Sequence, residues 1–214
     1  MKIAIVDYGM GNLQSVFNSV QTANELEALN AEIVLTADSG DILSADKIIF
    51  PGQGAMPDCM ASLHKSGLID VLHDCLQKKP FLGICVGAQL LFEYSEEGNT
   101  TGLGWFKGTV ARFTSEHVDG QGRYLKVPHM GWNQVYQTQT HPLFAAIEQN
   151  EWFYFVHSYY FLPRETDNVF ATADYPNKFA CIVSKDNVFA TQFHTEKSHT
   201  AGLQLLRNFL LWNG

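Results

Sequence analysis

Short runs of consecutive apolar residues, separated by glycine-containing turns, constrain the fold of this 214-residue chain more than any other feature. The first run extends from Ile3 to Asp7, and apolar residues at helical spacing follow it, with Asn12 in the N-cap position. Further runs occupy residues 33–35 and 48–50. The last ends at Pro51, which predicts that this strand stops there because proline cannot donate to a ladder. Uninterrupted apolar strands alternating with helices are typical of a parallel sheet covered on both faces.

From Gly108 onward the pattern changes, because strand-like runs become frequent. The link from Lys185 to Val188 predicts a tight hairpin, and the apolar stripe around Leu206 predicts a closing amphipathic helix. We therefore expect an α/β, flavodoxin-like fold: a central, mostly parallel sheet flanked by helices, with an antiparallel extension. The length favours one domain over residues 1–214. The strand-like runs are residues 109–113, 152–160, 169–173, 179–183 and 188–193.

Composition excludes several classes of function. The net charge is −8 and Lys and Arg form no cluster, which disfavours nucleic-acid binding. No apolar run approaches a membrane span, and the N-terminal run is too short for a signal peptide. The four cysteines lack CxxC spacing, which predicts free thiols in a reducing compartment, so we expect a cytoplasmic protein. No metal-ligand spacing such as H-E-x-x-H occurs, and we expect neither a metal nor another cofactor.

The segment 83–89, GICVGAQ, is the strongest candidate for chemistry. It follows an apolar run and leads into Leu90 and Leu91, which predicts a strand, a sharp turn and a helix, with residues 93–98 as an acidic helix end and loop. Glycines on both sides of Cys85 would let the backbone bend tightly, and the helix N-terminus would favour a thiolate. The alternative is that Cys85 is simply a small buried apolar residue.

A second candidate lies near the end of the chain, where a predicted strand leads into QFHTE. His194 and Glu196 are two residues apart, so at a strand end both side chains would point the same way. A carboxylate against an imidazole fixes its tautomer and orientation. The alternative is that His194 ends a strand structurally while Glu196 is solvated.

These pieces fit one type of reaction, attack of a thiolate on a carbonyl carbon. Cys85 would be the nucleophile, His194 the base and later the acid, and Glu196 the group that orients the imidazole. The backbone N–H groups of Gln53 and Val86 would stabilise the oxyanion, one from each strand end. The spacing does not name the substrate.

Segments 83–89 and 192–198 resemble the motifs of the class I, or triad, glutamine amidotransferases. Within that family the chain is similar to the glutaminase subunits of imidazole glycerol phosphate synthase, an enzyme of histidine biosynthesis. The motifs that carry this closer resemblance are DYGMGN at 7–12, KVPHMGWN at 126–133 and YFVHSY at 154–159. The resemblance covers essentially the whole chain.

The resemblance implies that the protein hydrolyses L-glutamine to glutamate and ammonia through a Cys85 thioester. It implies that ammonia passes to a (β/α)8-barrel cyclase subunit, which makes imidazole glycerol phosphate and AICAR. The implied substrate-binding residues are Gly54, Gln89, Glu97 and Ser158. The implied contacts with the cyclase are Asn12, Trp132, Tyr154 and Lys197.

Three departures from the family pattern involve four positions. Thr195 stands where proline is usual between the His and Glu of the triad, Val86 and Ala88 replace Leu and Met in the elbow, and Gln53 replaces Val. These departures leave open a paralogous amidotransferase subunit that serves another ammonia-using partner. The other readings are a stand-alone cysteine hydrolase or peptidase and a non-catalytic scaffolding subunit. The subfamily motifs argue against the hydrolase, and the complete Cys, His and Glu set argues against the scaffold.

Overall fold

The computed structural model describes residues 1–114, 124 and 126–214. Its centre is a parallel sheet in the order β2-β1-β3-β4-β13. Strands β1, β3, β4 and β13 are almost completely buried, as expected for a sheet covered on both faces. The five strands are β1 (Lys2–Val6), β2 (Glu32–Thr36), β3 (Lys47–Gly52), β4 (Phe81–Cys85) and β13 (Val188–Thr191).

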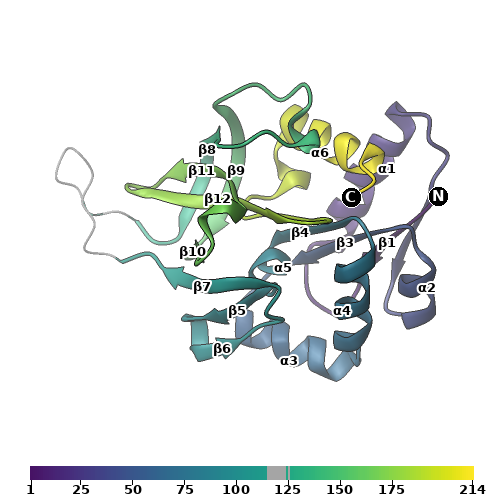
Figure 1. Cartoon of the computed structure of the whole chain (residues 1–214), viewed down its shortest axis with the longest axis horizontal. Coiled ribbons are helices and arrows are strands. Elements are labelled where there is room, and N and C mark those ends of the chain that lie inside the picture. Colours follow the sequence, from purple (N-terminus) through teal and green to yellow (C-terminus); the bar gives the residue numbers. More distant parts are fainter. Residues whose placement is uncertain (115–123, 125) are drawn as a thin grey trace.

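Helices cover both faces of this sheet (Figure 1). Helices α1 (Leu13–Leu26) and α6 (His199–Leu211) pack together on one face. Helices α2 (Ser39–Ser44), α3 (Met56–Ser66) and α4 (Ile69–Lys78) lie on the other. Asn12 precedes α1 as predicted, but its side chain makes no capping hydrogen bond. Over the described residues, no helix is long and apolar enough to cross a membrane.

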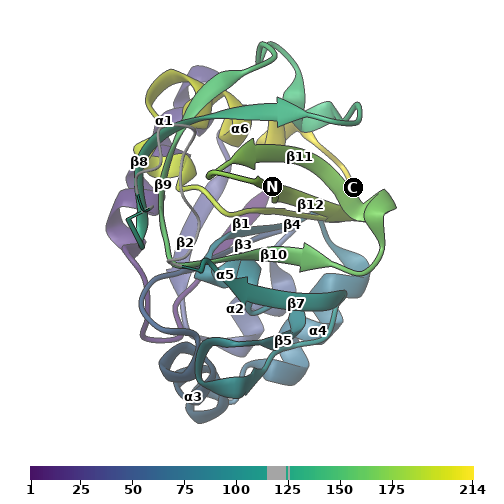
Figure 2. The ribbon, with the colours of Figure 1, turned by 90° about the vertical axis from the view of Figure 1, so that its left-hand side faces the viewer.

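The second half of the chain extends the sheet with mostly antiparallel pairs (Figure 2). The path continues through β12, β10, β7, β5 and β6, while β11, β8 and β9 branch from β12. The predicted hairpin is present, because Lys185 pairs with Val188 across a two-residue turn. The extension comprises β5 (Phe92–Ser95), β6 (Thr100–Thr101), β7 (Phe106–Arg112), β8 (His129–Gln137), β9 (Glu151–His157), β10 (Tyr159–Pro163), β11 (Val169–Asp174) and β12 (Lys178–Lys185). The expected α/β fold with an antiparallel extension is confirmed.

The structure differs from the sequence predictions at four places. Pro51 lies inside β3, because pairing with β1 ends at Ile49 and the proline then needs no N–H on that side. The run 152–160 forms two strands, β9 and β10, separated at Ser158. Strand β8 was not predicted, because glycine and polar residues interrupt its apolar pattern. The helix after Cys85, α5 (Val86–Gln89), has four residues, and the chain enters β5 where a helix end was expected.

Candidate active site

The candidate residues meet at the carboxyl edge of the parallel sheet. Strands β3 and β4 end side by side, with Gly52 opposite Cys85, and β13 runs parallel to β4 on its other side. Gln53, Cys85 and His194 therefore leave neighbouring strands at the same edge. This is where ligands bind in open α/β sheets.

Cys85 has an unusual backbone conformation, with φ 54° and ψ −114°. A non-glycine residue with positive φ is strained, and such strain is typical of a nucleophile held on a strand-to-helix turn. Two glycines allow close packing around this turn: Gly87, two residues after Cys85, and Gly52, which lies opposite Cys85 on β3. A Cβ on Gly87 would lie 2.0 Å from the Phe50 carbonyl oxygen, and one on Gly52 would lie 2.4 Å from the Gly87 nitrogen. Their absent side chains let the ends of β3 and β4 carry Gln53 and Val86 to the same cavity.

His194 and Glu196 are paired as predicted, with 2.7 Å between Nδ1 and Oε1. The predicted reason was wrong, because β13 ends at Thr191 and the 3₁₀ turn η4 (Thr195–Lys197) brings the two side chains together. Burial disfavours the imidazolium, but the charge and hydrogen bond of Cys85 and then the Glu196 carboxylate outweigh it. Together they raise the pKa of His194 to about 10. The His194 imidazole therefore keeps its proton at pH values well above 6.5.

A closed set of hydrogen bonds holds η4 against β9. The His194 N–H donates to the Tyr154 carbonyl at 3.0 Å. The Tyr154 N–H donates to the Ser198 hydroxyl at 3.0 Å, and that hydroxyl donates back to the His194 carbonyl at 2.6 Å. The backbone of β9 thus positions His194.

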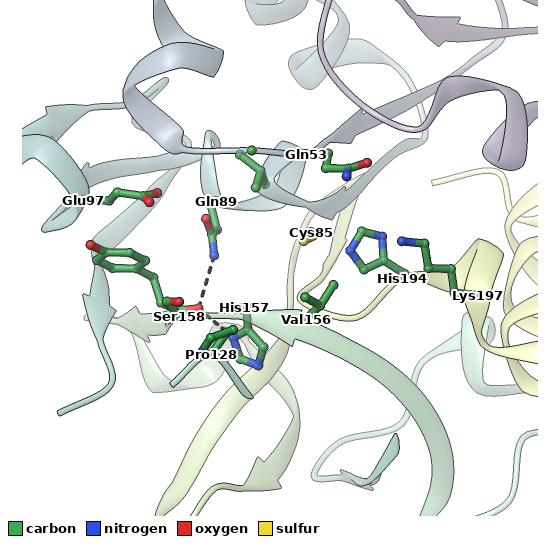
Figure 3. A pocket seen from close by; sticks show the side chains of 13 residues that line it. Gln53, Cys85, Gln89, Glu97, Pro128, Val156, His157, Ser158, His194 and Lys197 are labelled. Atoms are coloured by element: carbon green, nitrogen blue, oxygen red, sulfur yellow. Dashed lines mark hydrogen bonds between the residues drawn. The ribbon is translucent and has the colours of Figure 1, made fainter. Parts of the chain in front are cut away.

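A cavity of about 280 Å³ opens in front of Cys85 (Figure 3). Its volume lies near the lower end of the range for small-molecule sites, which suits an amino acid. Figure 3 shows Cys85 and His194 side by side on one side of the cavity, with Gln89, Glu97 and Ser158 on the other. The lining residues that the sequence predicted are Gln53, Gly54, Cys85, Val86, Gln89, Glu97, Ser158, His194 and Lys197.

Four lining residues were not singled out as site residues: Pro128, Val156, His157 and Tyr159. All four belong to the motifs at 126–133 and 154–159, so the motif positions were a usable signal. They reach the cavity because β8 pairs with β9 in the antiparallel extension, which places His129 opposite His157.

Two polar side chains in the cavity are held by backbone groups. The Gln89 carboxamide nitrogen donates to the Tyr159 carbonyl at 3.3 Å. The Glu97 carboxylate accepts the Met56 N–H at 2.8 Å. These bonds fix an amide and an anion beside the nucleophile, a combination that can recognise the polar groups of an amino acid.

Two buried histidines connect the cavity to β8. The His157 Nδ1–H donates to the Tyr159 carbonyl at 2.7 Å, so its Nε2 accepts from His129 Nδ1 at 2.9 Å. Asn133 donates to the remaining nitrogen of His129 at 3.3 Å. Burial lowers the pKa of His129 to about 4 and that of His157 to about 3. Both rings are therefore neutral at pH 7, with one tautomer each.

Of the four residues predicted to contact a partner, Trp132 lies on β8 and Tyr154 on β9. Trp132 pairs with Tyr154 across the two strands, their ring centroids 5.8 Å apart, and Trp132 remains 41% exposed. Trp132 also stacks on His199 at 5.0 Å. Lys197 lines the active-site cavity, while Asn12 precedes α1. Over the described residues, no group of three or more His, Cys, Asp and Glu side chains could hold a metal ion.

The sequence matches the protein family described as glutamine amidotransferase class-I over residues 4–212. The chain belongs to this family. A curated relative, the imidazole glycerol phosphate synthase subunit HisH of Neisseria meningitidis serogroup A, is 63% identical over 212 residues, or 99% of this chain and 100% of that protein. The HisH subunit of Chromobacterium violaceum is 60% identical over 214 residues, or 100% of this chain and 99% of the relative. The expected family resemblance is confirmed, and this glutamine amidotransferase is a glutamine-hydrolysing enzyme.

Solved structures of lower identity agree with the fold. A crystal structure of a glutamine amidotransferase aligns over 98% of this chain and 97% of that chain, with a TM-score of 0.68 at 17% identity. A protein from Thermoplasma acidophilum described as a putative GMP synthase subunit aligns over 98% of this chain and 92% of that chain. Its TM-score is 0.64 at 20% identity. This amidotransferase therefore has the fold found in those structures.

Proposed function

We propose that this amidotransferase is the glutaminase subunit of an imidazole glycerol phosphate synthase and that Cys85, His194 and Glu196 are its catalytic triad. The observation that carries the proposal is one cavity lined by the strained Cys85 and by His194, whose Nδ1 lies 2.7 Å from Glu196. The high identity to HisH subunits over the full chain supports this particular member of the family.

The reaction follows from the geometry. The Cys85 thiolate attacks the side-chain carbonyl carbon of glutamine, and the backbone N–H groups of Gln53 and Val86 stabilise the oxyanion. The His194 imidazolium protonates the leaving nitrogen, and ammonia departs to leave a γ-glutamyl thioester. His194 then takes a proton from water, whose oxygen attacks the thioester, and glutamate leaves as the sulfur is restored.

The cavity walls would bind the rest of the substrate. Gln89 and Glu97 offer an amide and a carboxylate that are fixed in place by the Tyr159 carbonyl and the Met56 N–H. Gly54 and Ser158 also line this cavity. No step requires a metal or another cofactor.

We propose that the ammonia enters a (β/α)8-barrel cyclase subunit that docks on the surface with Asn12, Trp132, Tyr154 and Lys197. Trp132 is an exposed aromatic residue of the kind enriched at protein interfaces. Tyr154 holds His194 through its backbone, so a partner on this face would touch the strand that positions the base. The four unpaired cysteines support a cytoplasmic location, and the family match over 4–212 supports one domain.

Replacement of the nucleophile tests the proposed function. With the cyclase subunit present, Cys85→Ala should abolish product formation from glutamine and leave formation from ammonium salts intact, because only the supply of ammonia is lost. Both rates are measured from the imidazole product. If both were lost, Cys85 would have a structural role and the proposal would be wrong.

Dependence on the partner is a separate prediction. Gln53 and Gly54 are exposed at the mouth of the cavity, where a docked subunit can reset an oxyanion donor. One such donor changes turnover by roughly 10²–10³-fold, so addition of the nucleotide-bound cyclase should raise glutaminase turnover by about that factor. If the isolated chain hydrolysed glutamine as fast as the complex with the nucleotide-bound cyclase, this coupling would be contradicted.

A further inference from the structure

Gln192 is a completely buried amide that the reaction described above does not use. It lies between the end of β13 and His194, and its N–H donates to the Cys181 carbonyl at 2.8 Å, which fixes its backbone to β12. Its side chain extends to the active site. A buried amide must have its donors and acceptors satisfied, so its contacts there are informative.

The two ends of this amide face two different functional groups. Its nitrogen lies 4.0 Å from the Cys85 sulfur, within hydrogen-bond distance for sulfur. Its oxygen accepts from the Gln89 carboxamide nitrogen at 3.1 Å. Gln192 therefore links the nucleophile to a wall of the substrate cavity.

The link determines which end of Gln89 faces the substrate. The Gln89 nitrogen has two hydrogens, one donated to the Tyr159 carbonyl and one to the Gln192 oxygen. In the described part of the chain no donor reaches the Gln89 oxygen, which is left for a substrate N–H. Without Gln192 the Gln89 amide could rotate and offer a donor in place of this acceptor.

We propose that Gln192 is a positioning residue that orients Gln89 as a hydrogen-bond acceptor for the substrate and donates an N–H to the Cys85 thiolate. The proposal rests on the proposed function, in which Cys85 is the nucleophile and Gln89 binds glutamine. One side chain would thus join substrate recognition to activation of the sulfur.

Two variants separate the two bonds. Gln192→Glu keeps an acceptor for Gln89 but removes the donor to Cys85, whereas Gln192→Leu has a similar volume and removes both. Gln137→Glu serves as the control. It makes the same amide-to-carboxylate change at the last residue of β8. Thermal unfolding checks that each variant is folded, and if Gln192→Leu fails to fold, Gln192→Met replaces it.

The first readout is the pH dependence of iodoacetamide alkylation of Cys85, followed by mass spectrometry of its peptide. The Cys85→Ala variant gives the background from the other three cysteines, all of which are buried. A hydrogen bond to a charged group contributes enough to move the alkylation midpoint upward by about one pH unit when it is lost. We expect that shift in Gln192→Leu, a larger one in Gln192→Glu because its carboxylate also repels the thiolate, and none in Gln137→Glu.

The second readout is glutamine hydrolysis by the complex with the cyclase. Gln192→Glu should keep the KM for glutamine within about twofold of the wild type, while Gln192→Leu should raise it about tenfold, the effect of one lost hydrogen bond. An unchanged alkylation midpoint in Gln192→Leu would overturn the role toward Cys85. An unchanged KM in Gln192→Leu would overturn the role toward Gln89. A wild-type protein without glutaminase activity would instead refute the proposed function.

Discussion

Thr195 lies between the two paired residues of the candidate triad, and its hydroxyl is buried without a hydrogen-bond partner among the described residues. It is the first residue of η4, and no hydrogen bond of the described chain uses its N–H. His194 before it has φ −89° and ψ 107°, a conformation that also suits a residue preceding proline. This position therefore meets the requirements for proline, the residue usual in the family.

We predict that Thr195→Pro raises the free energy of unfolding by about 1 kcal/mol, because it restricts the unfolded chain and removes an unpaired buried hydroxyl. Glutaminase turnover should be retained, since the first turn of a helix tolerates proline. Urea unfolding and a glutaminase assay check both points. Thr195→Val, which removes only the hydroxyl, is the control, and a proline variant less stable than the valine variant would contradict the backbone argument.

At the scale of elements, helix α6 supports the turn that pairs His194 with Glu196. Gly202 lies where η4 approaches the helix, and a Cβ there would be 1.9 Å from the Thr195 carbonyl oxygen and 2.8 Å from the Ser198 Cβ. The Gly202 N–H also donates to the Ser198 carbonyl at 3.0 Å. The helix and the turn can approach this closely only because residue 202 has no side chain.

Gly202→Ala should therefore displace η4 and separate His194 from Glu196. Overpacking of this kind costs about 1–3 kcal/mol of stability, and turnover should fall by more than about tenfold because the base loses its orientation. Thr200→Ala, at an exposed position of the same helix, is the matched control. Equal turnover in the two variants would show that the close contact does not position the triad.

At the scale of the whole molecule, buried neutral histidines link the stability of the fold to pH. His129 and His157 share a hydrogen bond inside the extension. His141 packs between Phe189 and Trp212 near the end of α6. Burial lowers the pKa of His129 and His141 to about 4 and that of His157 to about 3, against 6.5 for an ordinary histidine.

Because these three pKa values are lower in the folded state, the unfolded chain binds more protons below pH 6.5. The contribution of these three histidines is thus fully present above pH 6.5 and is lost as pH falls toward 4, by about 1.4 kcal/mol per pH unit for each histidine. Urea unfolding between pH 6.5 and about 5 measures the slope, because His194, whose pKa is raised to about 10, is protonated in both the folded and the unfolded state over that range. His141→Gln should reduce it by about one third. His64→Gln, at an exposed position on α3, is the control, and an equal reduction in that variant would contradict the assignment.

The sequence alone determined the central parallel strands and the residue types of the candidate site. Continuous apolar runs predicted the buried parallel strands, and the residue types at 85, 194 and 196 predicted a thiolate reaction. The prediction of the strands succeeds because burial follows short-range periodicity, and the proposed chemistry follows from residue type alone.

Only the tertiary structure decided how these parts meet. The close approach of Gly52 and Gly87, the 3₁₀ turn that pairs His194 with Glu196 and the contact of Gln192 with Cys85 all join distant or irregular segments. The antiparallel extension likewise brings Pro128 and His157 to the cavity. Periodicity shows which face of a strand is buried but does not specify which strand packs beside it, because that choice depends on the packing of the whole core.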